Sequence, residues 1–207
     1  MRIRACEANI RWSGKTYEET STRRSMADEP VRVMGLSGSI SASSANQSLL
    51  TLALRAAEQA GAEIVRWDLE ENPLPLVGAA DSWEDENVKA FQKMAKSVDA
   101  FIVSSPEYHG SVSGVIKNQF DWLYFEHVEG KTFGLMSTLG GQTNSNTLNH
   151  LRLIVRWLRA WTVPTQVAVG KVKNAFNDDG ELADEELANR VEKLAHEVID
   201  HANRMRD

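Results

Sequence analysis

The chain has 207 residues, of which 42% are hydrophobic and 25% charged, values typical of one globular domain whose core needs neither disulfides nor a structural metal. Its formal net charge of -6 argues against a nucleic-acid partner, because proteins that bind backbone phosphates usually carry a basic face. Cys6 is the only cysteine and no apolar run approaches the roughly 20 residues that span a membrane, so we expect no disulfide framework, no thiolate metal site, no membrane association and a reducing, cytoplasmic location.

The N-terminal stretch is polar and shows no helical or strand period. We expect residues 1–29 to form a disordered or loosely ordered extension and residues 30–207 to form the folded domain. Met26 begins a stretch that reads like a natural start, so the preceding residues are interpreted as an upstream extension. The competing interpretation, a functional basic arm, is weaker because acidic residues are interleaved with the basic ones. The basic residues are Arg2, Arg4, Arg11, Lys15, Arg23 and Arg24.

An apolar run that begins at Val31 gives way to a serine-rich loop and then to a helical pattern, which predicts a strand, an anion-binding turn and a helix. Hydroxyls and free backbone N–H groups would converge where the helix begins, and the helix dipole adds partial positive charge there. Such a loop can hold a phosphate monoester without Lys or Arg, and no basic residue lies between Val33 and Leu54. The loop residues are Ser37, Gly38, Ser39, Ser41, Ser43, Ser44 and Asn46.

The alternative is that these serines only form a loop and cap the helix. Their position favours a ligand, because loops at the carboxyl ends of strands form the binding crevice of an open α/β sheet. The spacing of Gly35 and Gly38 does not match the G-x-G-x-x-G fingerprint of dinucleotide-binding loops, and the Gly-Lys pair of the Walker loop is absent. The expected ligand is therefore a mononucleotide or the phosphate end of flavin mononucleotide.

Strands and helices alternate along the rest of the chain, which favours a parallel α/β sheet. We expect further strands at residues 62–69, 100–104, 132–137 and 163–169, and helices at residues 85–96, 115–125, 148–161 and 184–205. After the second strand, Pro73 and Pro75 predict a long loop across the top or rim of the sheet. Trp83 in this loop either walls a pocket or an interface, or covers the edge of the core.

Two more strand ends lead into loops that suit the close approach of a flat ligand. After the third strand, Pro106 fixes one turn, while Gly110 and Gly114 permit unusual backbone conformations. Tyr108 and His109 lie between them. After the fourth strand, the small residues are Gly140, Gly141, Thr143 and Asn144. Together with the serine loop, these loops would line one crevice.

The helix expected at residues 115–125 is apolar over much of its circumference. This pattern is typical of a helix that is buried on two sides, against its own sheet and against a partner subunit. The alternative is a core helix within one subunit.

Two motifs together resemble the NADPH-dependent FMN reductase family, which includes bacterial quinone, azo-dye and chromate reductases. The first runs from Gly38-Ser39 through Asn46, and the second is Ser-Pro-Glu-Tyr-His-Gly-Ser at residues 105–111 with Lys117-Asn118 and Asp121-Trp122-Leu123. The resemblance extends from about Val31 to Met205. It implies a flavodoxin-like three-layer α/β sandwich, with a five-stranded parallel sheet in the order 2-1-3-4-5 and helices on both faces.

The resemblance also implies where the cofactor FMN would bind. The phosphate would be held by Ser39, Ser44 and Asn46, and Ser41 is also expected among the cofactor-binding residues. The ribityl chain and isoalloxazine edge would follow Pro106, Glu107, Tyr108, His109 and Gly110. Ser137, Gly140 and Gly141 would approach the pyrimidine end. Two positions depart from the family pattern: Ser41 stands where many relatives carry an arginine, and His109 where most carry an asparagine.

As a member of this family, the chain would pass hydride from NADPH or NADH to flavin N5 and then to a small-molecule acceptor, which would be a quinone, free flavin, azo compound or oxyanion. Glu107 and His109 are the candidate proton donors, although neither has a visible partner, and the histidines are too scattered for a metal site. The resemblance implies a homodimer or homotetramer through the helix with Lys117, Asp121 and Trp122. The alternatives are a flavodoxin-type electron carrier without NAD(P)H oxidation and an interaction module with a vestigial site.

Overall fold

A parallel sheet forms the centre of the computed structural model, which describes residues 29–142 and 145–206. The main strands are β1 (Arg32–Ser37), β2 (Glu63–Arg66), β3 (Ala100–Tyr108), β5 (Thr132–Thr138) and β6 (Trp161–Val169). They lie in the order β2-β1-β3-β5-β6, which confirms the 2-1-3-4-5 order expected for the main strands. A short strand, β4 (Ser111–Val112), pairs antiparallel with the end of β3. The expected N-terminal extension lies outside the described residues, except for Glu29.

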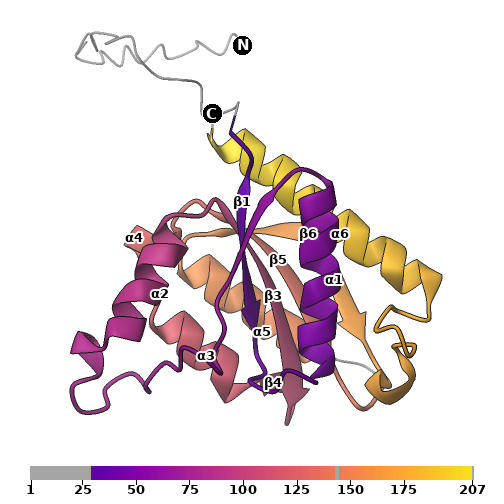
Figure 1. The fold of residues 1–207 in the computed structure, drawn as a ribbon, viewed down its shortest axis with the longest axis horizontal. Coiled ribbons are helices and arrows are strands. Elements are labelled where there is room, and N and C mark those ends of the chain that lie inside the picture. The colour runs from indigo at the N-terminus through magenta and orange to yellow at the C-terminus, as the bar shows by residue number, and fades with distance from the viewer. Residues whose placement is uncertain (1–28, 143–144, 207) are drawn as a thin grey trace, which may run out of the picture.

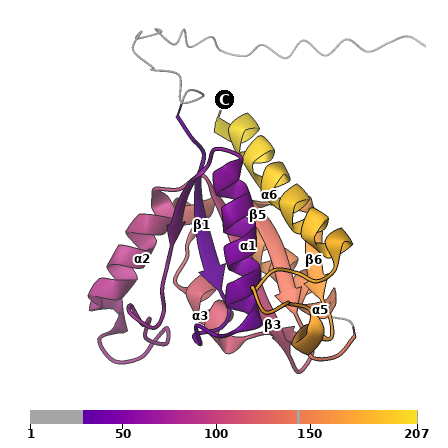
Figure 2. The same ribbon diagram turned by 45° about the vertical axis from the view of Figure 1, so that its right-hand side comes forward.

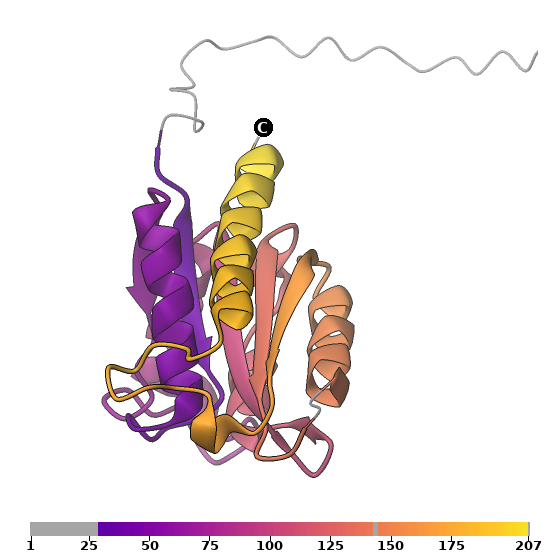
Figure 3. The same ribbon diagram turned by 90° about the vertical axis from the view of Figure 1, so that its right-hand side faces the viewer.

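Helices cover both faces of this sheet (Figure 1). The longer ones are α1 (Ala45–Gln59), α2 (Glu86–Lys96), α5 (Ser145–Trp157) and α6 (Glu185–Arg206), and the shorter ones are α3 (Gly114–Asp121) and α4 (Phe125–Val128). The 3₁₀ turns η2 (Ser82–Glu84) and η3 (Val172–Asn174) lie in the connections. Figure 3 shows α1 and α6 on one side of the sheet and α5 on the other.

The two helical layers enclose separate parts of the core. Under α1 and α6, apolar side chains of both helices pack on the sheet, and Gly134 lets α6 approach closely: a Cβ there would lie 2.7 Å from Leu194 Cδ2. On the other face, Phe101 and Phe133 stack with their ring centroids 4.5 Å apart. Because β3 and β5 are covered on both faces, they are buried almost throughout, which explains their continuous apolar runs.

The carboxyl ends of the strands lie at the bottom of Figure 1, and the end of α6 lies at the opposite edge, beside the start of β1 (Figures 1 and 2). There, Arg206 donates to the carbonyl oxygens of Glu29 and Pro30 and forms an ion pair with Asp99 at 2.9 Å. The same Asp99 carboxylate accepts the backbone N–H of Arg32 at 2.7 Å. The last helix is thus fastened at the edge of the sheet that is remote from the serine loop.

Two expected helices have different bounds in the structure. The helix expected at residues 115–125 divides into α3 and α4, because Trp122 ends α3 and places its indole N–H on the Pro75 carbonyl oxygen at 2.8 Å. The helix expected at residues 148–161 ends at Trp157, since Arg159 adopts a left-handed conformation and Trp161 already belongs to β6. Trp83 packs on Trp122, with ring centroids 5.0 Å apart, and so covers the edge of the core.

Candidate functional site

The register of the sheet brings the ends of β1, β3 and β5 to one place. Ser37 is paired with Ser104, and Pro106 is paired with Thr138. The loops that follow these strands therefore share one edge of the sheet, as expected for a binding crevice. Gly38 makes the first contact between them, because a Cβ at this position would lie 2.9 Å from Pro106 Cδ.

The serine loop has the donor set of an anion site. Ser44 is the N-cap of α1, and its hydroxyl accepts the N–H of Asn46 at 3.2 Å. Within the part of the chain that the structure describes, the backbone N–H groups of residues 40–43 and 45 donate to no acceptor. The hydroxyls of Ser41 and Ser43 lie 3.1 Å apart on the surface, and the first turn of α1 carries no acidic residue. Unpaired N–H groups, hydroxyls and a helix N-terminus suit a phosphate.

Asn46, expected to bind phosphate, has a different environment from the serines. Its side chain is buried, its amide nitrogen donates to Thr138 Oγ1 at 2.8 Å, and its amide oxygen accepts from Ser104 Oγ at 3.0 Å. The side chain therefore ties the start of α1 to the ends of β3 and β5. This places Asn46 beneath the loop, where it positions the groups above it.

The loop expected after the third strand is a β-hairpin. β3 continues to Tyr108, so the expected end of this strand at Ser104 is wrong, and Tyr108 pairs with Ser111 of β4. The two residues between them, His109 and Gly110, have φ angles of 52° and 75°. Positive φ at both positions is the signature of a type I′ turn, for which Asn-Gly is the preferred sequence. His109 and Tyr108 are exposed at the tip.

Glu107 links this hairpin to α5. Its carboxylate accepts the backbone N–H of Thr147 at 3.1 Å, where a negative charge is favourable at the N-terminus of a helix. Thr147 Oγ1 donates to the Ser111 carbonyl oxygen at 3.0 Å, and Ser111 Oγ lies 3.0 Å from His150 Nδ1. Sequence reasoning missed Thr147, Ser111 and His150, because only the fold brings α5 to the hairpin.

The loop after β5 completes the crevice as far as the structure describes it. Ser137 is buried near the end of β5. The loop that follows is fixed to the segment after β6, because the Gly141 carbonyl oxygen accepts the N–H of Lys171 at 2.6 Å. A Cβ at Gly140 would meet no atom within 4 Å, so open space lies beside it. Thr143 and Asn144, expected in this loop, lie outside the described residues.

Comparisons with known proteins identify the family of the chain. The model of the family described as NADPH-dependent FMN reductase matches residues 31–174. The chain belongs to this family. An FMN-dependent NADPH-azoreductase of Staphylococcus saprophyticus is 38% identical over 140 residues, which cover 64% of this chain and 74% of the relative. One from Staphylococcus aureus is 35% identical over 144 residues, covering 66% and 77%.

Solved structures show the same fold for this reductase. The flavoenzyme NAD(P)H:(acceptor) oxidoreductase FerB of Paracoccus denitrificans superposes with a TM-score of 0.70 at 23% identity, covering 84% of this chain and 98% of that one. A flavodoxin from the domain Archaea gives a TM-score of 0.58 at 10% identity, covering 86% and 100%. The expected flavodoxin-like fold is therefore confirmed, and the family makes the protein an oxidoreductase that acts with FMN and NADPH.

Within the described residues, no group of His, Cys, Asp or Glu side chains could hold a metal ion, and no helix is long and apolar enough to cross a membrane. At the crevice, the described part of the reductase presents hydroxyls and backbone N–H groups without an acceptor. Groups of this kind suit a phosphate.

The second family motif has a structural function in this reductase. The Asn118 side-chain nitrogen donates to the carbonyl oxygens of Leu74 and Pro75, and the Trp122 indole donates to Pro75 as well. Trp122 is completely buried within the chain, so its side chain does not reach the surface, and the expected interface through this helix stays a prediction. Asn118 and Trp122 instead hold the long loop that follows β2, whereas Lys117 and Asp121 lie on the surface as an ion pair.

Proposed function

We propose that FMN binds in the crevice with its phosphate on the loop formed by residues 38–45, and that NADPH reduces it there. The observation that carries the proposal is the set of backbone N–H groups without an acceptor at the start of α1, beside the hairpin of β3 and β4. Ser39, Ser41 and Ser44 add hydroxyl donors, and Asn46 fixes the loop from below. The chemistry that FMN supplies when bound is hydride transfer, from NADPH to the flavin and then from the flavin to a second substrate.

The chain's own groups would bind and orient the cofactor. Pro106 and Gly110 would follow the ribityl chain and the edge of the isoalloxazine ring together with Glu107, Tyr108 and His109. Glu107 would act through the position of the hairpin, since its carboxylate already accepts the Thr147 N–H. Ser137, Gly140 and Gly141 would border the pyrimidine end, where the open space beside Gly140 leaves room for a ring.

We further propose a small-molecule electron acceptor, with an azo compound or a quinone as the first classes to test. The FMN-dependent NADPH-azoreductases that resemble the chain support an azo acceptor. A cytoplasmic location agrees with this proposal, because the single cysteine suits a reducing compartment in which NADPH is available. The other interpretation of the sequence, a flavodoxin-type carrier that exchanges electrons with a protein and does not oxidise NADPH, disagrees with the family to which the chain belongs.

We also propose a homodimer or homotetramer, formed through an apolar groove between α3, α4 and α5. The groove has a volume of about 450 Å³ and is bordered by Lys117 and Asp121. Trp157 and Leu153, on its α5 side, are 72% and 59% exposed. Large apolar side chains so exposed beside a groove are typical of protein interfaces. A second copy of the chain would bury them.

An anaerobic experiment tests the enzyme proposal. The full chain is mixed with FMN and excess NADPH, and the visible absorbance of oxidised flavin is followed against a control without protein. We expect rapid bleaching, and recovery of the absorbance when a quinone or an azo dye is added. Binding of FMN without bleaching by NADPH or NADH would favour the carrier, and failure to bind FMN would exclude the proposed site.

A further inference from the structure

Arg66 lies at the end of β2, beside the serine loop. In the sheet it is paired with Gly35 of β1, two residues before the strand ends at Ser37. Its guanidinium reaches across to α1, where one nitrogen donates to Thr51 Oγ1 at 3.1 Å and another donates to Gln47 Oε1. The fold thus places the guanidinium of Arg66, which belongs to the strand beside β1, against the first turns of the helix that begins at the serine loop.

Gln47 connects Arg66 to the loop itself. Its amide nitrogen donates to the Ser39 carbonyl oxygen at 2.8 Å. Because Arg66 occupies the amide oxygen of Gln47, the amide can present only its nitrogen to Ser39. This hydrogen bond holds the loop at Ser39, whose carbonyl oxygen also accepts from Ser37 Oγ at 3.1 Å. Arg66 is therefore a positioning residue for the loop.

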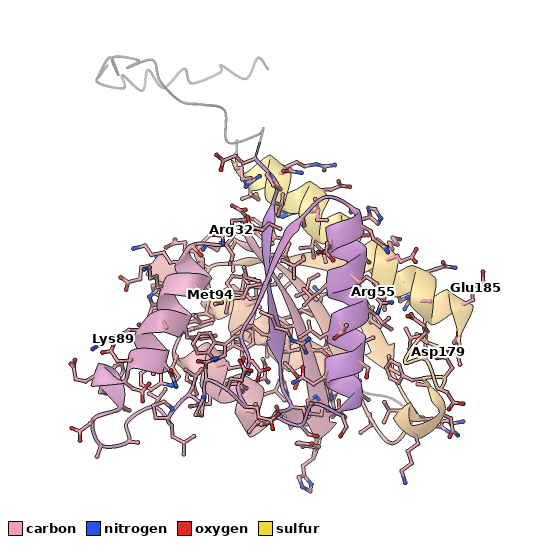
Figure 4. The ribbon with its side chains drawn as sticks, in the orientation of Figure 1. Arg32, Arg55, Lys89, Met94, Asp179 and Glu185 are labelled. Carbon is pink, nitrogen blue, oxygen red and sulfur yellow. The ribbon has the colours of Figure 1, made fainter. Side chains whose placement is uncertain are left out.

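The charge of Arg66 is available because its hydrogen-bond partners are neutral. Among the residues that the structure describes, no carboxylate oxygen lies within ion-pair distance of Arg66, and Asp68 acts on it only from farther away. Arg55 lies on α1, the helix that Arg66 contacts (Figure 4), and lines the same surface cleft, but it forms an ion pair with Glu181 at 2.6 Å. Within the described residues, Arg66 thus differs from Arg55 in forming no ion pair, although Asp68, Glu70 and Asp179 line the same cleft.

We propose that Arg66 is the cation of the phosphate site, and that it acts on the phosphate of FMN through the Gln47–Ser39 connection and through its charge. This inference rests on the proposed function. It explains how a loop without Lys or Arg between Val33 and Leu54 offsets the double negative charge of a phosphate monoester.

The test compares FMN with riboflavin, which has the same ring system but no phosphate. Dissociation constants are measured by quenching of flavin fluorescence in the flavin-free full-length chain. For Arg66→Met we expect FMN to bind about five- to tenfold more weakly at low salt, with a smaller difference at about 0.5 M salt, because exposed charges are screened. Riboflavin binding should be unchanged. Arg55→Met is the matched control and should bind both flavins as the wild type does.

Two further variants separate the two parts of the proposal. Arg66→Lys keeps the charge and should recover part of the lost FMN affinity, including its dependence on salt. Gln47→Met breaks the connection to Ser39 but keeps the cation, so FMN should bind more weakly while the salt dependence stays as in the wild type. Equal FMN affinity in Arg66→Met and the wild type would overturn the inference, as would an equal loss of FMN and riboflavin binding. A wild-type chain that binds neither flavin would overturn the proposed function itself.

Discussion

The side-chain nitrogen of Asn46 donates to Thr138 Oγ1 at 2.8 Å, which joins the first turn of α1 to the last residue of β5 across 92 positions of sequence. The side-chain oxygen of Asn46 accepts from Ser104 Oγ, so the same residue also joins β3. All three side chains are buried. The serine loop is therefore built on a polar connection between the strand ends, and its geometry depends on that connection.

Replacing Asn46 with alanine should destabilise the domain. The hydroxyls of Ser104 and Thr138 would lose their partners in a buried place, so we expect the free energy of unfolding in urea to fall by about 1–3 kcal/mol. Glu58→Ala, an exposed change on the same helix, is the control and should alter it by less than about 0.5 kcal/mol. If both variants unfold at the same urea concentration, the connection between the strand ends contributes nothing to stability.

The hairpin turn makes a second prediction, because His109 and Gly110 both have positive φ angles. Asparagine is favoured over histidine in this conformation, so His109→Asn should unfold at an equal or slightly higher temperature and bind FMN with unchanged affinity. Gly110→Val should lower the free energy of unfolding by about 1–2 kcal/mol, since a β-branched residue is strained there. Thermal unfolding and flavin titration measure both effects. A large loss of FMN affinity in His109→Asn would assign the imidazole a direct role.

The main strands and the place of the crevice could be predicted from the sequence because they depend on local patterns, whereas the order of the strands was implied by the resemblance to the family. Buried parallel strands such as β3 and β5 appear as continuous apolar runs, and the loops after them contain glycine and small polar residues. The sequence also contains a signal for the hairpin, the dipeptide His109-Gly110 between two segments that form paired strands. Pro106 concealed it, because proline inside a strand argues against a continued strand.

The functions of Asn46, Glu107 and Trp122 could not be predicted in this way. Each depends on partners that are distant in sequence: Thr138 for Asn46, Thr147 for Glu107 and Pro75 for Trp122. A polar residue near a loop looks the same in sequence whether its side chain is buried beneath that loop or exposed above it. Only the packing of α1, α3 and α5 on the sheet decides between the two.

His127 should make stability fall at acid pH. Burial lowers the pKa of this imidazole below its ordinary 6.5, and Lys96 and Lys131 lower it further, while Glu126 opposes them. Its Nδ1 accepts the N–H of Tyr124 at 3.0 Å, which the neutral ring allows. As the pH falls below 6.5, the unfolded chain binds a proton before the folded chain does, so the free energy of unfolding decreases.

The variant His127→Gln keeps an acceptor for the Tyr124 N–H but does not titrate. Urea unfolding of both proteins between about pH 5 and pH 8 should therefore show a shallower fall for the variant below pH 6.5. Above that pH the two curves should run parallel. The same slope in both proteins across the acid range would show that other groups cause the fall.

The last prediction concerns the oligomeric state and the groove between α3, α4 and α5. If a second copy of the chain covers Trp157 and Leu153, the wild type should have at least twice the chain mass in light scattering after size-exclusion chromatography. A charge in a buried apolar interface is costly, so Trp157→Glu should elute as a monomer with an unchanged circular dichroism spectrum. Met205→Glu places the same charge on an exposed apolar residue of α6 and should leave the mass unchanged. A wild type that stays monomeric at micromolar concentrations would contradict the proposed interface, and dissociation by Met205→Glu alone would place the interface on α6.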